Sequence, residues 1–148
     1  MFTFLVSVAL AVTVAPAASN QEQWDDKEEQ QCFDTAMTQP AMTGCANAAY
    51  KRADARLNVQ WAKTAAAFKR VDQFNKESGR EADAFDNLLK GQRAWLTYRQ
   101  ATCRAQGLVN AGGTIAGMNE LLCLASITGV RTKELFELSQ NPNSDEPL

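Results

Sequence analysis

The chain has 148 residues, a formal net charge of −2 and 45% hydrophobic residues, which suits one domain with a modest core. Histidine is absent, which excludes nucleophiles activated by histidine and metal sites that use it. So weak a negative charge argues against a nucleic-acid partner and gives only mild attraction toward basic partners. We therefore expect no metal, no cofactor and no nucleic acid.

Residues 1–17 form an uncharged, largely apolar stretch that ends in Ala15-Pro16-Ala17. Small residues there are typical of a signal-peptidase site, and the stretch is shorter than the roughly 20 apolar residues that span a membrane. The pattern predicts a signal peptide cleaved near Ala17, with an uncleaved anchor or a misassigned start as the alternative. No cysteine follows directly, so no lipid attachment is expected. We expect a bacterial periplasmic or secreted protein with no stable membrane anchor.

The four cysteines after this leader are Cys32, Cys45, Cys103 and Cys123. An even number of cysteines in a small exported protein indicates two disulfides, and three pairings are open. We favour the sequence neighbours, because a Cys32–Cys45 bridge would fold the lead-in onto the next helix and a Cys103–Cys123 bridge would close a helical hairpin. Each bridge would contribute about 3 kcal/mol by the chain-entropy argument. The spacings do not fit a CxxC redox or zinc motif, so the expected role is structural.

A flexible, mostly acidic lead-in is predicted over residues 18–31, with Trp24 as a candidate anchor. The first helix is predicted to begin after an N-cap at Thr38, with Pro40 tolerated in its first turn. Apolar residues then recur at steps of three and four, so the helix should extend to about Asn75.

The second helix is predicted to open at Ser78-Gly79-Arg80-Glu81, because Ser-x-x-Glu is a capping box, and to end near Gly107. The residues expected on its buried face are Phe85, Leu88, Leu89, Leu96 and Cys103. The Gly112-Gly113 pair permits a sharp turn after it.

Thr114 is the expected cap of a third helix, and residues 139–148 are polar and predict a disordered tail. No stretch of useful length alternates with period two. The sequence therefore predicts an all-α domain over residues 32–138, a small disulfide-linked bundle of about three main helices with antiparallel neighbours.

Polar residues recur on the facing sides of the first two predicted helices. Asp54 and Asn58 lie one turn apart on the first, and Gln92 and Arg99 lie two turns apart on the second. We expect Asp54 to pair with Arg99, with Asn58 and Gln92 completing the hydrogen bonds, because buried polar groups need partners. The alternative is that all four face solvent. Either way the group is structural, since a carboxylate held by an arginine is a poor general base.

Trp95 and Tyr98 are either core residues or one exposed patch that binds a partner. The connection from Arg104 to Gly113 is a second candidate contact element, because a glycine-containing loop between helices is free to project. The acidic residues that lie closest together in the folded region are Glu77, Glu81, Asp83 and Asp86. A cell-wall hydrolase with paired carboxylates is thus the enzymatic alternative. Acids are common at helix starts for dipole reasons, so we predict no catalytic residue and no enzyme.

Two long strings are specific enough to carry a family resemblance. Ala53-Asp54-Ala55-x-Leu57-Asn58 and Gln92-Arg93-Ala94-Trp95-Leu96-x-Tyr98-Arg99-x-Ala101-x-Cys103 resemble the LprI-like lysozyme inhibitor domain, also represented by YecT-type exported proteins. Residues 38–45 are similar to the opening of that domain, and segments within 112–131 are similar to its close. The resemblance covers roughly residues 32–138. It implies a helical, disulfide-bonded domain of bacterial envelope or secreted proteins.

Some members of this family are linked to inhibition of lysozyme, so the resemblance implies a protein partner, lysozyme among the candidates. We expect an exported, non-enzymatic domain that inhibits lysozyme-type muramidases by occluding their cleft. The alternative is an envelope or immunity protein that binds a toxin or another cell-wall enzyme. Two departures stand out: the chain lacks the lipid-anchoring cysteine of the member that names the family, and Gln100 replaces a commonly acidic residue. Unrelated inhibitors use a Ser-Gly-x-x-Tyr loop, of which Ser78-Gly79 supplies only the first half.

Overall fold

The computed structural model describes residues 27–140, so the predicted signal peptide, the lead-in as far as residue 26 with Trp24, and tail residues 141–148 lie outside the described residues. Within 27–140 the chain forms four helices and no strand: α1 (Lys27–Thr35), α2 (Gln39–Glu77), α3 (Ala84–Leu108) and α4 (Ala116–Gln140). The predicted all-α class with three main helices is confirmed, and α1 is an additional short helix. No helix in this range is long and apolar enough to cross a membrane.

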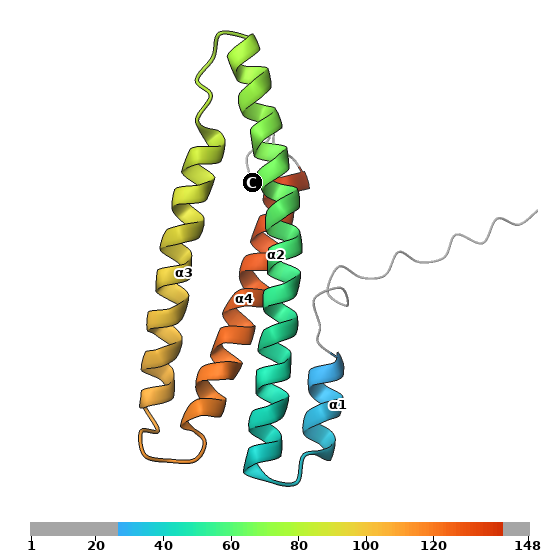
Figure 1. The fold of residues 1–148 in the computed structure, drawn as a ribbon, viewed down its shortest axis with the longest axis vertical. Coiled ribbons are helices and arrows are strands. Elements are labelled where there is room, and N and C mark those ends of the chain that lie inside the picture. The colour runs from blue at the N-terminus through green and yellow to red at the C-terminus, as the bar shows by residue number, and fades with distance from the viewer. Residues whose placement is uncertain (1–26, 141–148) are drawn as a thin grey trace, which may run out of the picture.

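The three long helices lie along one another in an elongated bundle (Figure 1). α3 runs antiparallel to α2 and α4, so α2 and α4 are parallel. The α1–α2 and α3–α4 loops lie at one end of the bundle and the α2–α3 loop lies at the other. Among the long helices, α2 and α4 make the most extensive contact, and α2 and α3 make the least.

Small side chains allow α2 and α4 to approach closely. The buried alanines at this contact are Ala46, Ala49 and Ala53 of α2 and Ala125 of α4. A larger apolar cluster follows along the bundle, where Leu57, Leu88 and Leu135 come from three different helices. Burying a leucine side chain contributes about 1.5–3 kcal/mol, so this cluster is a main source of stability.

Two polar residues of α2 also link it to α4. Thr64 is fully buried and donates a hydrogen bond from Oγ1 to the carbonyl oxygen of Leu135 at 2.8 Å. Gln60 Nε2 donates to Ser139 Oγ at 3.1 Å. Ser139 and Gln140, which the sequence predicts as the start of a disordered tail, are therefore the last residues of α4.

The start of α2 follows the prediction. Thr38 is the N-cap, and its Oγ1 accepts a hydrogen bond from the backbone N–H of Ala41 at 3.3 Å. Pro40 lies in the first turn, where its missing N–H would have had no helical partner. The helix continues to Glu77, slightly beyond the expected end at Asn75.

The predicted capping box does not form. Ser78 ends α2, and Gly79 adopts a φ of +67°, a conformation that favours glycine. The first N–H groups of α3 are satisfied instead by Asp72 of α2, whose carboxylate accepts from Ala84 N at 2.8 Å and Phe85 N at 2.9 Å. A cap from a neighbouring helix has no local signature, which is why the pattern at Ser78 was misleading.

Helix α1 occupies part of the expected flexible lead-in, since residues 27–31 are helical. Glu28 and Glu29 lie in its first turn, where acidic side chains favour a helix N-terminus. No residue of α1 is buried. The Cys32–Cys45 disulfide and an ion pair between Glu28 and Arg52 at 3.5 Å link α1 to α2.

Candidate functional site

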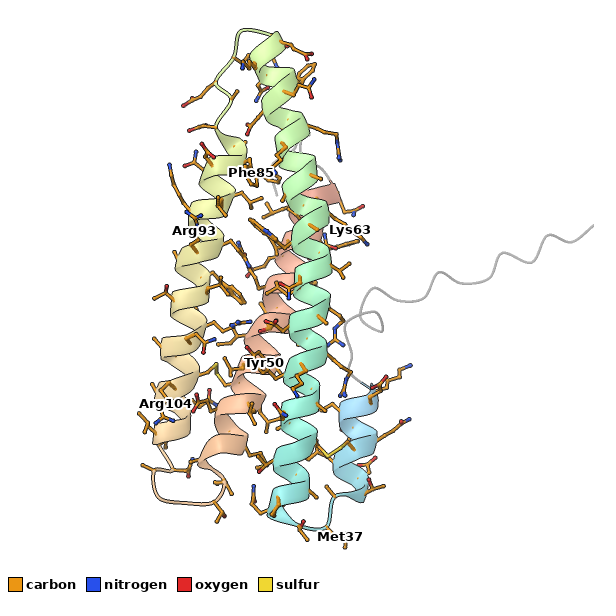
Figure 2. All side chains as sticks on the ribbon, viewed as in Figure 1. Met37, Tyr50, Lys63, Phe85, Arg93 and Arg104 are labelled. Carbon is orange, nitrogen blue, oxygen red and sulfur yellow. A yellow bond between two sulfur atoms is a disulfide. The ribbon has the colours of Figure 1, made fainter. Side chains whose placement is uncertain are left out.

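The two disulfides join Cys32 to Cys45 and Cys103 to Cys123, the pairs that the sequence favours. The first links α1 to α2, and the second links the last turns of α3 to α4 across the loop between them. No cysteine is free within residues 27–140, so this part of the chain offers no thiol for redox or nucleophilic chemistry. Both bridges lie toward the end of the bundle that holds the α1–α2 and α3–α4 loops (Figure 2).

Arg99 is the centre of a polar cluster that joins the three long helices. Its side chain is only 5% exposed, and its Nη1 donates to Asp54 Oδ1 of α2 at 2.9 Å and to Thr128 Oγ1 of α4 at 3.0 Å. Its Cζ also lies 5.5 Å from the ring centre of Tyr50, labelled in Figure 2, and 5.0 Å from that of Trp95. Arg99 Nε is buried without a hydrogen-bond partner, so the two aromatic faces offer its charge compensation in place of a further acceptor.

The four predicted polar residues divide into two groups. Asn58 Nδ2 donates to Asp54 Oδ2 at 3.3 Å and so joins the Asp54–Arg99 pair. Gln92 does not reach Asp54, because its Oε1 accepts from Arg131 Nε at 3.0 Å. Gln92 lies two turns from Arg99, about 10 Å along the helix axis, and at that height it faces α4. The expected bond between Gln92 and the Asp54 pair is therefore replaced by one to Arg131.

Trp95 and Tyr98 do not form one patch. Trp95 is partly buried, packs against the leucine cluster, and lies under the guanidinium groups of Arg99 and Arg131, the latter 6.0 Å from its ring centre. Tyr98 is 56% exposed. Trp95 thus belongs to the interior, and Tyr98 is the member of the pair that a partner can reach.

A groove with a volume of about 400 Å³ lies between α2 and α3, the two long helices that touch least. The residues that line it are Asp54, Leu57, Asn58, Trp61, Leu89, Gln92, Arg93, Leu96 and Arg99. All four predicted network residues therefore face the same groove. The groove thus combines four apolar side chains with five polar or charged ones, among them the Asp54–Arg99 pair.

Leu96 lies at this groove rather than in the core. The sequence predicts Leu96 on the buried face of its helix, but its side chain is 39% exposed. The buried residues of α3 are Leu88, Gln92, Arg99, Cys103 and Gly107. The buried face of α3 thus includes Gln92 and Arg99, which have hydrogen-bond partners on α2 or α4. Leu96 lies beside this face and not within it.

The acidic residues that suggested a hydrolase are all exposed around the α2–α3 loop: Glu77, Glu81, Asp83 and Asp86. Glu77 accepts from Gln73 at 3.0 Å and Asp83 accepts from Asn87 at 2.8 Å, both one helical turn away. Glycoside hydrolysis requires two carboxyl groups placed on either side of a bound sugar, one of them kept protonated by a partly dehydrated setting. All four carboxylates are instead exposed to solvent, and those of Glu77 and Asp83 accept hydrogen bonds from nearby residues of α2 and α3.

Three residues of the cluster were not predicted from the sequence: Tyr50, Thr128 and Arg131. The sequence offers only indirect evidence for Thr128 and Arg131, which lie in the segment within residues 112–131 that resembles the close of the family domain. Tyr50 lies one turn before Asp54, the position from which an aromatic ring on the same helix face reaches the same arginine.

Comparison with known proteins agrees with this architecture. A family model described as lysozyme inhibitor LprI matches residues 32–135, which extend from α1 into α4. An uncharacterized protein of Rhizobium meliloti (strain 1021) is 34% identical over 137 residues, covering 92% of this chain and 93% of that protein. No solved structure matches. The family, together with two disulfides, fits a protein that acts outside the cytoplasm. The chain belongs to the lysozyme inhibitor LprI family.

Proposed function

We propose that this protein is delivered to the periplasm or the exterior, loses its leader near Ala17, and inhibits a lysozyme-type muramidase by occluding the substrate cleft. The family match carries the proposal, because it covers the bundle from Cys32 to Leu135 and thus includes both disulfides and the Arg99 cluster. Occlusion requires a rigid body of suitable shape and no chemistry from the inhibitor itself.

The internal organisation of the bundle supports a rigid inhibitor. Arg99 connects all three long helices, and two disulfides restrain one end of the bundle. A surface held in its bound conformation loses less conformational entropy on association, so more of the contact energy is left as affinity. Tyr98 is the aromatic residue we assign to partner contact, while Trp95 acts from the interior.

The test is a lysis assay with the oxidised mature protein and several types of lysozyme. We expect inhibition that rises with protein concentration and saturates near one inhibitor per enzyme. The same titration on a soluble glycan substrate separates inhibition of the enzyme from coating of the cell wall. Full activity of every lysozyme at excess protein would refute the proposal.

A matched control tests the need for the folded bundle. A protein with Cys103 and Cys123 both replaced by serine lacks the α3–α4 bridge, and we expect it to inhibit less at temperatures where it partly unfolds. Recovery of a toxin or another cell-wall enzyme in a pull-down from periplasmic extract, with lysozymes unaffected, would favour the alternative of an envelope or immunity protein.

A further inference from the structure

The two ends of the bundle differ in charge. Residues 35–50 and 105–119 contain no Asp, Glu, Lys or Arg, and they include the α1–α2 and α3–α4 loops that lie at one end (Figure 1). Residues 69–90 at the other end are rich in charged side chains of both signs. We call the loops 36–38 and 109–115, with residues 39–42, 105–108 and 116–119 of the adjoining helices, the uncharged end; Asp34, in the last turn of α1, lies just outside it.

Large apolar side chains are exposed at the uncharged end. Met37 is 90% exposed, Val109 81%, Leu108 50% and Ile115 38%. Figure 2 shows Met37 at the extremity of the bundle. The two loops are neighbours, since Gln39 Nε2 at the start of α2 contacts Met118 Sδ at the start of α4 at 3.4 Å. Exposed apolar groups gathered at one uncharged end of a domain are typical of a protein interface.

The uncharged end is also well ordered by its own contacts. Successive tight turns form hydrogen bonds from Val109 N to Gln106 O at 3.3 Å and from Gly113 N to Asn110 O at 2.9 Å. Gly112 adopts a φ of +83°, which a residue with a side chain rarely takes. Both disulfides lie in the adjoining helices. The exposed apolar groups are therefore presented on a restrained support.

We propose that the uncharged end is the part of the protein that enters the muramidase cleft. This inference rests on the proposed function. Glycoside hydrolases place two carboxyl groups in the cleft, so an inserted segment that carried Asp or Glu would meet like charge, which costs several kcal/mol. The uncharged end carries no carboxylate of its own, and the two that border it, Asp34 and Glu120, accept hydrogen bonds from Gln30 and Arg104 within the bundle. Asn110 and Thr114 of the α3–α4 loop supply uncharged hydrogen-bond donors.

Charge also favours a protein cleft over a lipid surface as the occupant. Amphipathic elements that bind anionic membranes carry lysine or arginine beside their apolar side chains. The cation nearest to the α3–α4 loop in the sequence is Arg104, and it pairs with Glu120 at 3.0 Å. The apolar side chains of the α3–α4 loop thus lack a flanking unpaired cation that an anionic membrane would attract.

The test replaces apolar residues at each end with aspartate. Val109→Asp and Met37→Asp, singly and together, alter the uncharged end, and Phe74→Asp is the matched control because Phe74 is 52% exposed at the charged end. All three side chains are exposed, and melting temperatures verify that each variant is folded. We expect the double variant to weaken inhibition at least about tenfold, as loss of a central interface contact does, and Phe74→Asp to change it less than about twofold.

The outcomes separate the two proposals. If the unmodified protein inhibits and the double variant inhibits equally well, this inference is overturned and the proposed function stands. If the unmodified protein leaves every lysozyme active, the proposed function fails and this inference fails with it. If the protein sediments with phosphatidylglycerol vesicles, and the double variant loses that binding while it keeps full inhibition, the uncharged end belongs to a membrane contact and the inference is wrong.

Discussion

Replacing Asp54 with alanine tests the central claim about the bundle interior. The variant keeps Arg99, whose side chain is 5% exposed, and removes the carboxylate that lies 2.9 Å from its Nη1. Thr128 and the two aromatic rings remain around the guanidinium. The substitution therefore isolates the contribution of the opposite charge.

The magnitude follows from how deeply each partner is buried. Removing one partner of a fully buried ion pair costs about 3–5 kcal/mol, because the remaining charge has lost its compensation. The side chain of Asp54 is 38% exposed, so water can replace part of the carboxylate, and the expected loss falls to roughly 2–3 kcal/mol. For a domain of this size that corresponds to a fall in melting temperature of roughly 10 °C.

Chemical denaturation followed by circular dichroism measures this loss. The matched control is Glu134→Ala, which removes the carboxylate of the Arg131–Glu134 pair, also 2.9 Å long but with Glu134 51% exposed. We expect that control to cost less than about 1 kcal/mol. If Asp54→Ala destabilises the protein no more than Glu134→Ala, the claim that a buried charge pair holds the helices is wrong. Adding Arg99→Met to Asp54→Ala should recover stability, because it removes the uncompensated charge.

Three further changes have defined outcomes. Gly107→Ala should lower the free energy of unfolding by about 1–3 kcal/mol, because the new Cβ would lie 3.0 Å from the Glu120 side chain of α4. Gly91→Ala is the control: a Cβ there would have nothing within 4 Å, so the same urea titration should show a rise of about 0.5–1 kcal/mol. Thr64→Val should cost about 1–2 kcal/mol, because it removes the hydrogen bond from Thr64 Oγ1 to the Leu135 carbonyl at 2.8 Å and the acceptor of Gln60 Nε2, and an unchanged midpoint would contradict this. Replacing Cys32 and Cys45 with serine should speed amide exchange in α1 alone, because that helix has 9 residues and buries none of them. Loss of protection throughout α2, α3 and α4 would contradict that last prediction.

Features encoded by nearby residues could be predicted from the sequence. Thr38 three residues before Ala41 fixes the start of α2, and the apolar periodicity fixes the course of the three long helices. The disulfide pairs follow from cysteines that lie on consecutive elements. The pairing of Asp54 with Arg99 could be predicted because both side chains lie on facing sides of their helices, and burying either charge without the other would be costly.

The remainder depends on contacts between distant segments. Asp72 caps α3 from the preceding helix, so Ser78 could not reveal where α3 begins. Gln92 is buried because Arg131 of α4 bonds to it, and a hydrophobicity pattern for α3 alone favours Leu96 for that face instead. For the same reason, the sequence predicted the polar residues of the candidate site on α2 and α3 but not Tyr50 or the α4 partners Thr128 and Arg131.

The order of the disulfides along the chain has a consequence for how the protein acquires them. Each bridge joins consecutive cysteines, first with second and third with fourth, at separations of 13 and 20 residues. In a chain that is oxidised as it emerges from a translocation pore, Cys45 is the first thiol that Cys32 meets, and an oxidant that acts quickly closes that pair before Cys103 arrives. Correct pairing then requires an oxidant but no isomerase, because no wrong bond needs to be exchanged. Both disulfides can thus form before α4 packs against α2. Because contacts between segments distant in the sequence form slowly, the chain makes them when incorrect disulfides can no longer form.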